Sequence, residues 1–563
     1  MRKLWRRGLG MAALCSCAPV LAEPAHYIVF ALDSQDRAQA VFYAQVELAD
    51  GAARAATLDG GSGNSGTDRF LWQGLRKGEA AGGGEIRVPR QLRVEHGNAG
   101  ETALQHLSAE DPHRAFVLRL PLAQADTLEL VGDRQLQRFD LGQLAATAST
   151  LPLASVQPAR LLQAQRSGSS TAAANSGNRL DVLLIGDGYT AAEQTTFATH
   201  ANALHTAMFN VSPYKEYASF VNWQPGFVAS SQSGADHPPY QAGCTSTSCC
   251  ADPAAQTDPR AGTFVSTALD STFCTAQIHR TLFANSSKVF AAAVGFPDWD
   301  KILVTVNDPV YGGAGGSFAV LSAHALAPSI VIHEFGHSFT GLADEYTTPY
   351  PGFPACSDLG VNPGCEANVT NQTNASLVKW RSWFTPGIQI PTPAGTAGLG
   401  LFAGARYLSA GMYRPTENQC LMNALGANFC AVCRQEYVRK LYRGGFGVPA
   451  GGIDLIEPGS EYPPAAAPVH YAQGTQRSFG AALLRPSVGN IGLQWYLDGN
   501  PVATTESYTF QQLTPTPATR TLELRVTDQT ALVQPAMAGD LLTHSRTWTI
   551  QVGNDRLFDD GFQ

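Results

Sequence analysis

The chain has few charged residues and no long apolar run. Charged side chains make up 15% of its 563 residues, and the formal net charge is −8. Proteins that bind nucleic acid usually carry a basic surface, so this balance predicts no nucleic-acid partner. No segment after the N-terminal leader has eighteen consecutive apolar residues, which predicts no transmembrane segment once the leader is removed. Hydrophobic residues make up 44% of the chain, which indicates folded domains.

The first 22 residues have the pattern of a secretory leader. Four of the first seven residues are basic, an apolar stretch follows at 9–21, and the sequence before Glu23 fits a signal-peptidase site. Cys17 ends a segment that loosely resembles a lipoprotein box, although Cys15 fits that pattern poorly. We therefore expect a secreted or periplasmic protein, with lipid anchoring through Cys17 as the less favoured alternative.

Removal of residues 1–22 leaves nine of the eleven cysteines. Cysteine clusters in an exported chain usually form disulfides, and Cys356–Cys365 closes the short loop that we favour most. No second CxxC accompanies Cys430 and Cys433 to complete a zinc ribbon, so we expect Cys420 to form a disulfide with one of them. Because nine is odd, at least one thiol is free or pairs outside the chain.

Strand patterns flank a central segment of mixed pattern. Residues 24–140 contain short alternating runs separated by Gly-rich turns, which predicts a β-sandwich. Residues 141–178 are rich in Ala, Ser, Gln and Gly and are predicted to be a linker. Alternating strands return at 451–553, and a lone Trp in LQWYLDG indicates an immunoglobulin-like sandwich. Residues 554–563 form an acidic-aromatic tail.

Residues 179–447 predict an α/β domain. The continuous apolar runs RLDVLLIG and KILVTVN are typical of buried strands. Thr190 and Glu193 have the spacing of a capping box, which predicts a helix that runs to Phe209. A further helix is expected at 430–442. Strands and helices in alternation indicate an α/β layer.

The segment HEFGH, residues 333–337, has the spacing of a zinc site. His333 and His337 lie four residues apart, so on a helix both imidazoles share a face. Catalytic zinc takes three protein ligands and keeps one position open for water. Glu334 follows the first histidine and is placed to accept a proton from that water. Apolar neighbours indicate that the helix is buried, where unliganded histidines would need other partners.

A third ligand is expected just after this helix. Gly341 should end the helix, because glycine readily adopts the left-handed conformation that a sharp reversal needs. A chain that turns back there can bring either Asp344 or Glu345 to the metal.

Four segments resemble the bacterial zinc metallopeptidases of the IgA-peptidase family. They are DVLLIGDGYTAAE, YGGAGG, HEFGHSFTGLADEY and CLMNALGANFCAVC, in the family's order. The resemblance implies a metzincin-like catalytic fold, one catalytic zinc ion and endopeptidase activity on a protein or peptide substrate. It also implies that Met422 is the methionine of a turn under the zinc.

The spacing departs from the common metzincin pattern by one residue. Gly341 lies four residues after His337 instead of three, while the step of three from glycine to the last ligand is kept at Asp344. We therefore prefer Asp344 as the third ligand, with Glu345 as the alternative. The carboxylate that does not bind metal would orient a histidine.

We expect a secreted zinc endopeptidase in which His333, His337 and Asp344 hold the metal and Glu334 is the general base. Residues 317–322 are expected to form a short strand that binds an extended substrate. Host or environmental glycoproteins such as immunoglobulin A are candidate substrates. The alternatives are a catalytically weak secreted protein that binds glycan or protein, and a cell-wall peptide hydrolase. The sequence does not indicate an oligomeric state.

Overall fold

The structure, a computed structural model, describes most of the chain. The described residues are 23–48, 55–56, 67–96, 105–123, 125–132, 135–148, 162–163, 176–349, 353, 355–360, 364–444, 452–472, 475–512 and 518–553. The predicted leader at 1–22 and the predicted tail at 554–563 lie outside these residues. Among the described residues, no helix is long and apolar enough to cross a membrane.

The N-terminal region contains two four-stranded sheets with a common core. One sheet has the order β2-β1-β8-β3 and the other has the order β10-β9-β4-β5. The bounds are β1 Glu23–Leu32, β2 Ala38–Leu48, β3 Ala55–Ala56, β4 Thr67–Arg76, β5 Glu79–Pro89, β8 Ala115–Pro121, β9 Thr127–Val131 and β10 Leu136–Asp140. Phe116 of the first sheet packs against Phe30 of its own sheet and Phe70 of the other, which joins the two.

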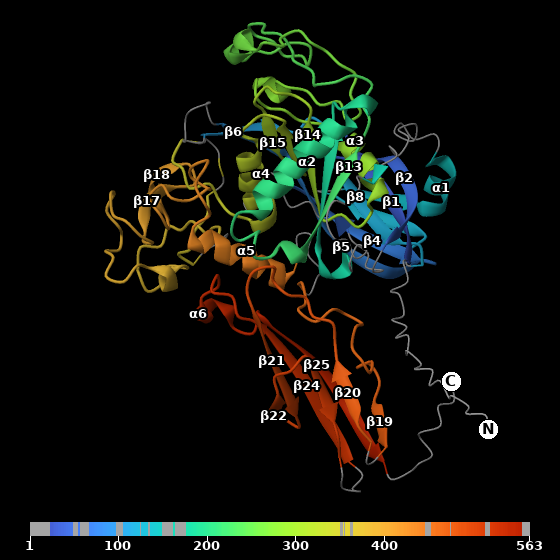
Figure 1. Ribbon diagram of the computed structural model, residues 1–563. Helices are drawn as coiled ribbons and strands as arrows, with labels where there is room; N and C mark the ends of the chain where they lie inside the picture. The colour runs from blue at the N-terminus through green and yellow to red at the C-terminus, as the bar shows by residue number, and fades with distance from the viewer. Residues whose placement is uncertain are drawn as a thin grey trace, which may run out of the picture.

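An eight-stranded sheet forms the centre of the molecule, with the order β11-β13-β12-β14-β16-β15-β6-β7 (Figure 1). The bounds are β6 Gln91–His96, β7 Gln105–Glu110, β11 Leu162–Gln163, β12 Leu180–Asp187, β13 Val221–Phe227, β14 Lys301–Val306, β15 Gly313–Gly315 and β16 Ala319–Ser322. The four strands β13, β12, β14 and β16 are parallel. The predicted strands in RLDVLLIG and KILVTVN are confirmed as β12 and β14.

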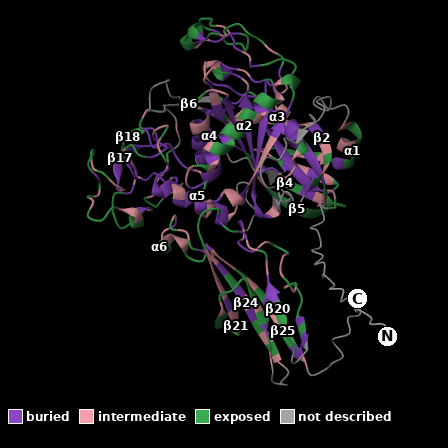
Figure 2. Cartoon of the chain, in the orientation of Figure 1, coloured by how far each residue is buried: buried purple, intermediate pink, exposed green. Residues whose placement is uncertain are grey.

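Helices cover both faces of this sheet. They are α2 Gln194–Phe209, α3 Ser286–Ala292, α4 Ala327–Phe335 and α5 Ala431–Arg443. Two other helices lie outside this layer: α1 Leu141–Thr147 packs against the N-terminal core, and α6 Pro535–Ala538 lies between β24 and β25. Side chains of β12 alternate between the faces, as in any strand. Val182 and Leu184 join the core that includes α2, α4 and α5, while Leu183 and Ile185 join the core that includes α3. Figure 2 shows that the central strands are largely buried.

Two sequence predictions about helices are confirmed and one region differs. The capping box of Thr190 and Glu193 is present, and the helix that follows ends at Phe209. The helix expected at 430–442 is α5. The segment predicted as a linker begins instead with α1, whose N-cap Asp140 accepts a hydrogen bond from the backbone N–H of Gln143.

The prediction that the strand within residues 317–322 binds an extended substrate is wrong. The strand β16 lies inside the sheet, parallel to β14 on one side and antiparallel to β15 on the other. Its backbone groups are therefore already paired on both sides and cannot take up an extended peptide. The strands β6 and β7, which come from the N-terminal region, extend the sheet beyond β15.

The C-terminal region contains a five-stranded sheet, β19-β25-β24-β21-β22, and a two-stranded sheet, β20-β23. The bounds are β19 Val469–Ala472, β20 Arg477–Gly480, β21 Ile491–Leu497, β22 Asn500–Ala503, β23 Ser507–Phe510, β24 Ala518–Asp528 and β25 Thr543–Gly553. The buried Trp495 stacks on Trp548 of β25. Asp528 accepts hydrogen bonds from the hydroxyls of Tyr217 (2.6 Å) and Tyr442 (2.8 Å), which ties this region to the central one.

The described residues contain three disulfides. The predicted pair Cys356–Cys365 is confirmed, and the other two are Cys244–Cys249 and Cys250–Cys274. The disulfide predicted between Cys420 and either Cys430 or Cys433 is wrong, because all three are buried free thiols. The Sγ atoms of Cys420 and Cys433 lie 3.5 Å apart, whereas a disulfide needs about 2.0 Å.

Candidate active site

The predicted motif lies on α4 and on the turn that follows it. Residues 336–340 form a π-helical turn, a wider form that is frequent at functional sites. The backbone N–H of Gly341 donates to the carbonyls of both Gly336 and His337. Gly341 has φ +72°, so the predicted stop in a left-handed conformation is confirmed.

The structure brings His333, His337 and Asp344 together in the interior. The two Nε2 atoms lie 3.0 Å apart, and Oδ1 of Asp344 lies 3.1 Å from Nε2 of His337 and 3.3 Å from Nε2 of His333. Ligands at about 2.0–2.1 Å from a tetrahedral zinc ion lie about 3.3 Å from one another. The three atoms therefore have the spacing of one face of a zinc coordination shell.

Hydrogen bonds fix the tautomer of both histidines. Nδ1 of His333 lies 3.1 Å from the carbonyl oxygen of Leu421, and Nδ1 of His337 lies 2.7 Å from that of Leu342. A carbonyl only accepts, so each Nδ1 carries the hydrogen and each Nε2 presents a lone pair. Two lone pairs and a carboxylate that converge in a buried space repel one another, and a cation relieves this repulsion. The donor set thus fits a bound metal ion.

Asp344, and not Glu345, is the carboxylate beside the imidazoles. Burial alone would raise its pKa, but positive charge on His337 and His333, which a bound metal ion would replace, holds the pKa of Asp344 well below its usual range. The carboxyl is therefore ionised at neutral pH, as metal binding requires. The side chain of Glu345 instead accepts a hydrogen bond from Asn368 (2.9 Å) and lies beside three cysteines.

A residue that the sequence did not predict orients Asp344. The hydroxyl of Tyr407 donates to Oδ2 of Asp344. Tyr407 lies in the turn between β17 (Phe402–Ala405) and β18 (Leu408–Arg414), where Arg406 and Tyr407 both have positive φ. The backbone N–H of Arg406 donates to the Asp344 carbonyl (3.0 Å), so the turn is fixed against this segment. No motif marks Tyr407, because its contact spans 63 positions.

Replacement of Tyr407 with Phe is expected to weaken metal binding without unfolding the protein. The ring remains, while the hydrogen bond that holds the Asp344 carboxylate is lost. Partners of this kind typically contribute about 10- to 100-fold in metal affinity or activity. Competition with a chelator of known affinity measures the change. An unchanged metal affinity and unchanged turnover would show that Tyr407 does not orient the carboxylate.

Met422 lies beneath the α4 helix. A Cβ built on Gly336 would lie 3.0 Å from Sδ of Met422, so the sulfur packs against the helix one residue before His337. The carbonyl of Met422 also accepts a hydrogen bond from the backbone N–H of Glu345 (2.8 Å). The methionine-turn role that the resemblance implies stays a prediction.

Residues 171–398 match the model of a protein family described as IgA Peptidase M64. The central segment belongs to that family. The description is that of a peptidase family, so the match supports peptidase activity for this segment. The matched M64 segment includes the motif and Asp344 but ends before Tyr407 and Met422, which are placed by geometry alone.

Other comparisons add no argument about the fold. No curated protein matches the chain. Among solved structures, a protein of Bacteroides fragilis described as a candidate beta-galactosidase is 8% identical over 96% of this chain and 88% of its own chain, with a TM-score of 0.11. A score this low does not indicate a common fold.

Glu334 lies on α4 between the two histidines of the M64 motif. Its side chain is buried, with 5% of the residue exposed. Its negative charge is one of the influences that raise the pKa of His337, after the larger effects of burial, which opposes the rise, and of Asp344. The Glu334 carboxylate is therefore near enough to His337 to influence its charge.

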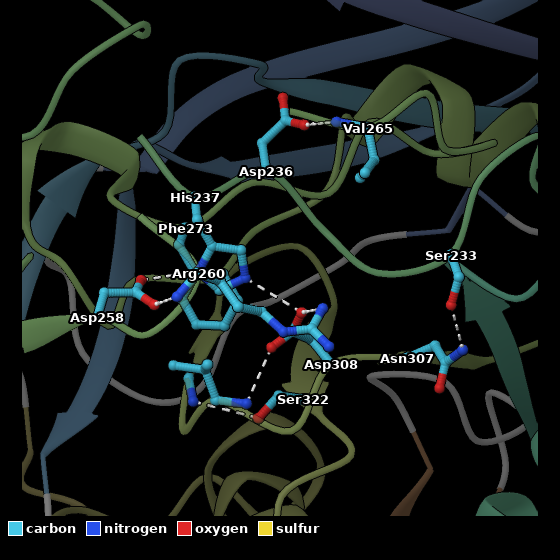
Figure 3. A network of polar contacts seen from close by, with 12 residues as sticks. Ser233, Asp236, His237, Asp258, Arg260, Val265, Phe273, Asn307, Asp308 and Ser322 are labelled. Atoms are coloured by element: carbon cyan, nitrogen blue, oxygen red, sulfur yellow. Dashed lines mark hydrogen bonds and ion pairs between the residues drawn. The ribbon is translucent and has the colours of Figure 1, made fainter. Parts of the chain in front are cut away.

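A network of titratable groups around His237 stabilises the long loop that follows β13. Figure 3 shows His237 between Asp258 (Nδ1–Oδ2 2.7 Å) and Asp308 (Nε2–Oδ2 3.1 Å). Arg260 also pairs with Asp308, and His279 pairs with Asp258. Asp308 follows β14, so the network fastens the loop to the carboxyl end of a central strand.

Asp187, at the end of β12, has the same structural role. Its carboxylate accepts hydrogen bonds from Ser230 Oγ and from the backbone N–H groups of Leu269 and Ser271. These three hydrogen bonds fix the loop to the end of β12.

The His237 network should make stability depend on pH. Burial disfavours the charged imidazole, but hydrogen bonds to Asp308 and Asp258 outweigh it and raise the pKa of His237. A raised folded-state pKa gives stability that is complete below the unfolded pKa of about 6.5 and is lost as pH rises through the folded value. The difference in unfolding free energy between wild type and His237→Gln should therefore shrink from pH 6 toward pH 9. Urea titrations at fixed metal concentration measure it, and a difference that grows with pH would contradict this account.

Proposed function

We propose that the protein is an exported zinc endopeptidase in which His333, His337 and Asp344 hold one catalytic ion. The observation that carries the proposal is the convergence of the three donor atoms within 3.0–3.3 Å of one another. Two imidazoles and a carboxylate with one open position form a ligand set typical of catalytic zinc. A zinc ion there supplies Lewis-acid activation of a peptide carbonyl and of a water molecule.

The remaining chemistry belongs to side chains of this chain. Glu334 accepts the proton of the attacking water and delivers it to the leaving amine, the role of a general base and then a general acid. Leu421 and Leu342 hold the imidazoles through their carbonyls, and Tyr407 holds the carboxylate of Asp344. These contacts fix the three donors before substrate binds, so little reorganisation is needed during the reaction.

We also propose a division of the chain into three folded parts. Residues 24–140 form a β-sandwich, apart from β6 and β7, which extend the central sheet. Residues 179–447 form a metzincin-like catalytic domain, and 451–553 form an immunoglobulin-like sandwich. The common core of the two N-terminal sheets supports the first sandwich, and the contact of Phe479 in β20 with Trp548 in β25 supports the second. The buried HExxH helix beside a parallel sheet supports the catalytic domain.

Export is supported by the leader pattern and by three disulfides, since disulfides persist in oxidising compartments. In such a location the substrate is an external protein or peptide, and glycoproteins such as immunoglobulin A are the class that the family name suggests.

Digestion of an unbiased peptide library tests the proposed activity. Cleavage should be lost with a chelator and restored when zinc is added back. Parallel digestion of purified cell-wall peptide tests the cell-wall alternative. Cleavage that persists after the metal has been removed would exclude the proposed mechanism, and an absence of cleavage with zinc present would favour a binding protein.

A further inference from the structure

A second buried cluster lies directly beside the candidate active site. Its members are Glu345, Cys420, Cys430 and Cys433, all of which are buried. They come from three separate segments, namely the turn after the motif helix, the segment that contains Met422, and the start of α5. The proposed peptidase mechanism uses none of these four side chains.

The spacing of the cluster fits a tetrahedral metal ion and does not fit a disulfide. The Sγ atom of Cys433 lies 3.5 Å from that of Cys420, 3.6 Å from that of Cys430 and 3.6 Å from Oε1 of Glu345. All four donor atoms lie within 4.8 Å of one another. Thiolates at about 2.3 Å from zinc lie about 3.8 Å apart, and a thiolate and a carboxylate oxygen lie slightly closer.

Disulfides within this cluster cannot use all three cysteines. The other six cysteines described are paired, so three remain in one place. A disulfide between any two of them would leave the third thiol buried beside a carboxylate. A metal ion uses all three.

One carboxylate oxygen of Glu345 lacks a hydrogen-bond donor among the described residues. Oε2 of Glu345 is buried and receives no N–H or O–H hydrogen bond from the described residues. A buried carboxylate oxygen without a partner is costly, and such an atom in a native structure calls for a ligand or an ion. The backbone N–H of Cys430 points to Sγ of Cys420 (3.5 Å), the kind of contact that stabilises a metal-bound thiolate.

We propose that Glu345, Cys420, Cys430 and Cys433 bind a second, structural zinc ion. Four protein ligands close the coordination shell and leave no open position for water, as in structural zinc sites. Thiolate ligands favour zinc over magnesium or calcium, and zinc undergoes no redox change in an oxidising compartment. The protein then carries two ions per chain, one more than the HExxH motif alone predicts.

This ion would stabilise the floor of the active site. Glu345 directly follows Asp344, and Cys420 directly precedes Leu421, whose carbonyl orients His333. The backbone N–H of Glu345 also donates to the carbonyl of Met422 (2.8 Å). Two segments that supply or orient catalytic ligands therefore meet again at the second site. The structural ion connects them and leaves the catalytic position open.

Metal analysis of the full chain separates the two sites. Purified wild-type protein should contain about two zinc ions per chain, and the double variant His333→Ala/His337→Ala should retain about one. Cobalt bound to this double variant should show a thiolate-to-metal charge-transfer band in the near ultraviolet. Adding Cys433→Ser should remove both that band and the remaining ion. The control Cys244→Ser/Cys249→Ser, which alters a disulfide elsewhere, should keep two ions.

Measurements that avoid cysteine variants keep the proposal testable if those variants do not fold. Native mass spectrometry of wild-type protein should show two zinc ions, and a single ion would overturn the proposal. In the double histidine variant, a chelator should increase alkylation of Cys420, Cys430 and Cys433. No increase, or a peptide map that links two of these cysteines by a disulfide, would also overturn it.

Discussion

Replacement of Glu334 with Gln is expected to abolish peptide hydrolysis while both metal sites stay filled. The amide keeps the shape of the side chain but cannot accept the proton of the attacking water. General acid-base groups typically contribute about 10²- to 10⁴-fold, so kcat should fall by that amount. Initial rates on a peptide found by library digestion measure the loss.

Zinc content is the control for this experiment. Glu334 is buried on α4, and a fall in activity that accompanies metal loss would indicate damage to the helix and not to the chemistry. Near-normal turnover in a variant with full metal content would show that another group activates the water.

Replacement of Asp344 with Ala is expected to release the catalytic ion and remove activity. The structure places its carboxylate 3.1 Å and 3.3 Å from the two Nε2 atoms, so the variant leaves only the two imidazoles as ligands. Residues that merely support a ligand contribute about 10- to 100-fold in metal affinity, so loss of the ligand itself should exceed 100-fold. Zinc content should fall from about two ions per chain to about one.

The adjacent Glu345→Ala variant is the matched control, because it removes a neighbouring buried carboxylate of the same charge. It should release the other ion and keep the catalytic one when freshly loaded. If Glu345→Ala empties the catalytic site and Asp344→Ala does not, the assignment of the third ligand is wrong by one residue.

The sequence predicts well those features that depend on neighbours along the chain. The pairing of His333 with His337 follows from helical spacing, and the stop at Gly341 follows from the conformational freedom of glycine. The strands β12 and β14 are continuous apolar runs, which indicate burial on both faces. Such patterns also predict the α2 capping box.

Features that depend on distant contacts could not be predicted. Nothing local marks Tyr407, which meets Asp344 through a turn whose two central residues adopt positive φ although neither is glycine or asparagine. The sequence predicts a disulfide among the last three cysteines because the chain is expected to be exported. The structure has free thiols there, beside Glu345, at Cys420, Cys430 and Cys433. The pairing of β16 on both edges depends on which strands become its neighbours.

The extra residue in the motif has a local structural explanation. Compared with the common metzincin spacing, the sequence has one more residue between His337 and Gly341. The π-helical turn at 336–340 accommodates this extra residue. There the backbone N–H of Gly341 donates a hydrogen bond to the carbonyl of Gly336, five residues earlier. A wide turn takes one residue more than an α turn, so the glycine still reverses the chain beside the histidines.

The hydrogen bonds from Tyr217 and Tyr442 to Asp528 affect the order in which the chain can fold during synthesis. A ribosome delivers the chain from its N-terminus, so the central sheet and the motif helix are made long before β24. The buried hydroxyls of Tyr217 and Tyr442 are therefore made 311 and 86 residues before the carboxylate that accepts their hydrogen bonds. These contacts of the central region are therefore completed only after β24 has been made, and a chain that stops before Asp528 lacks them.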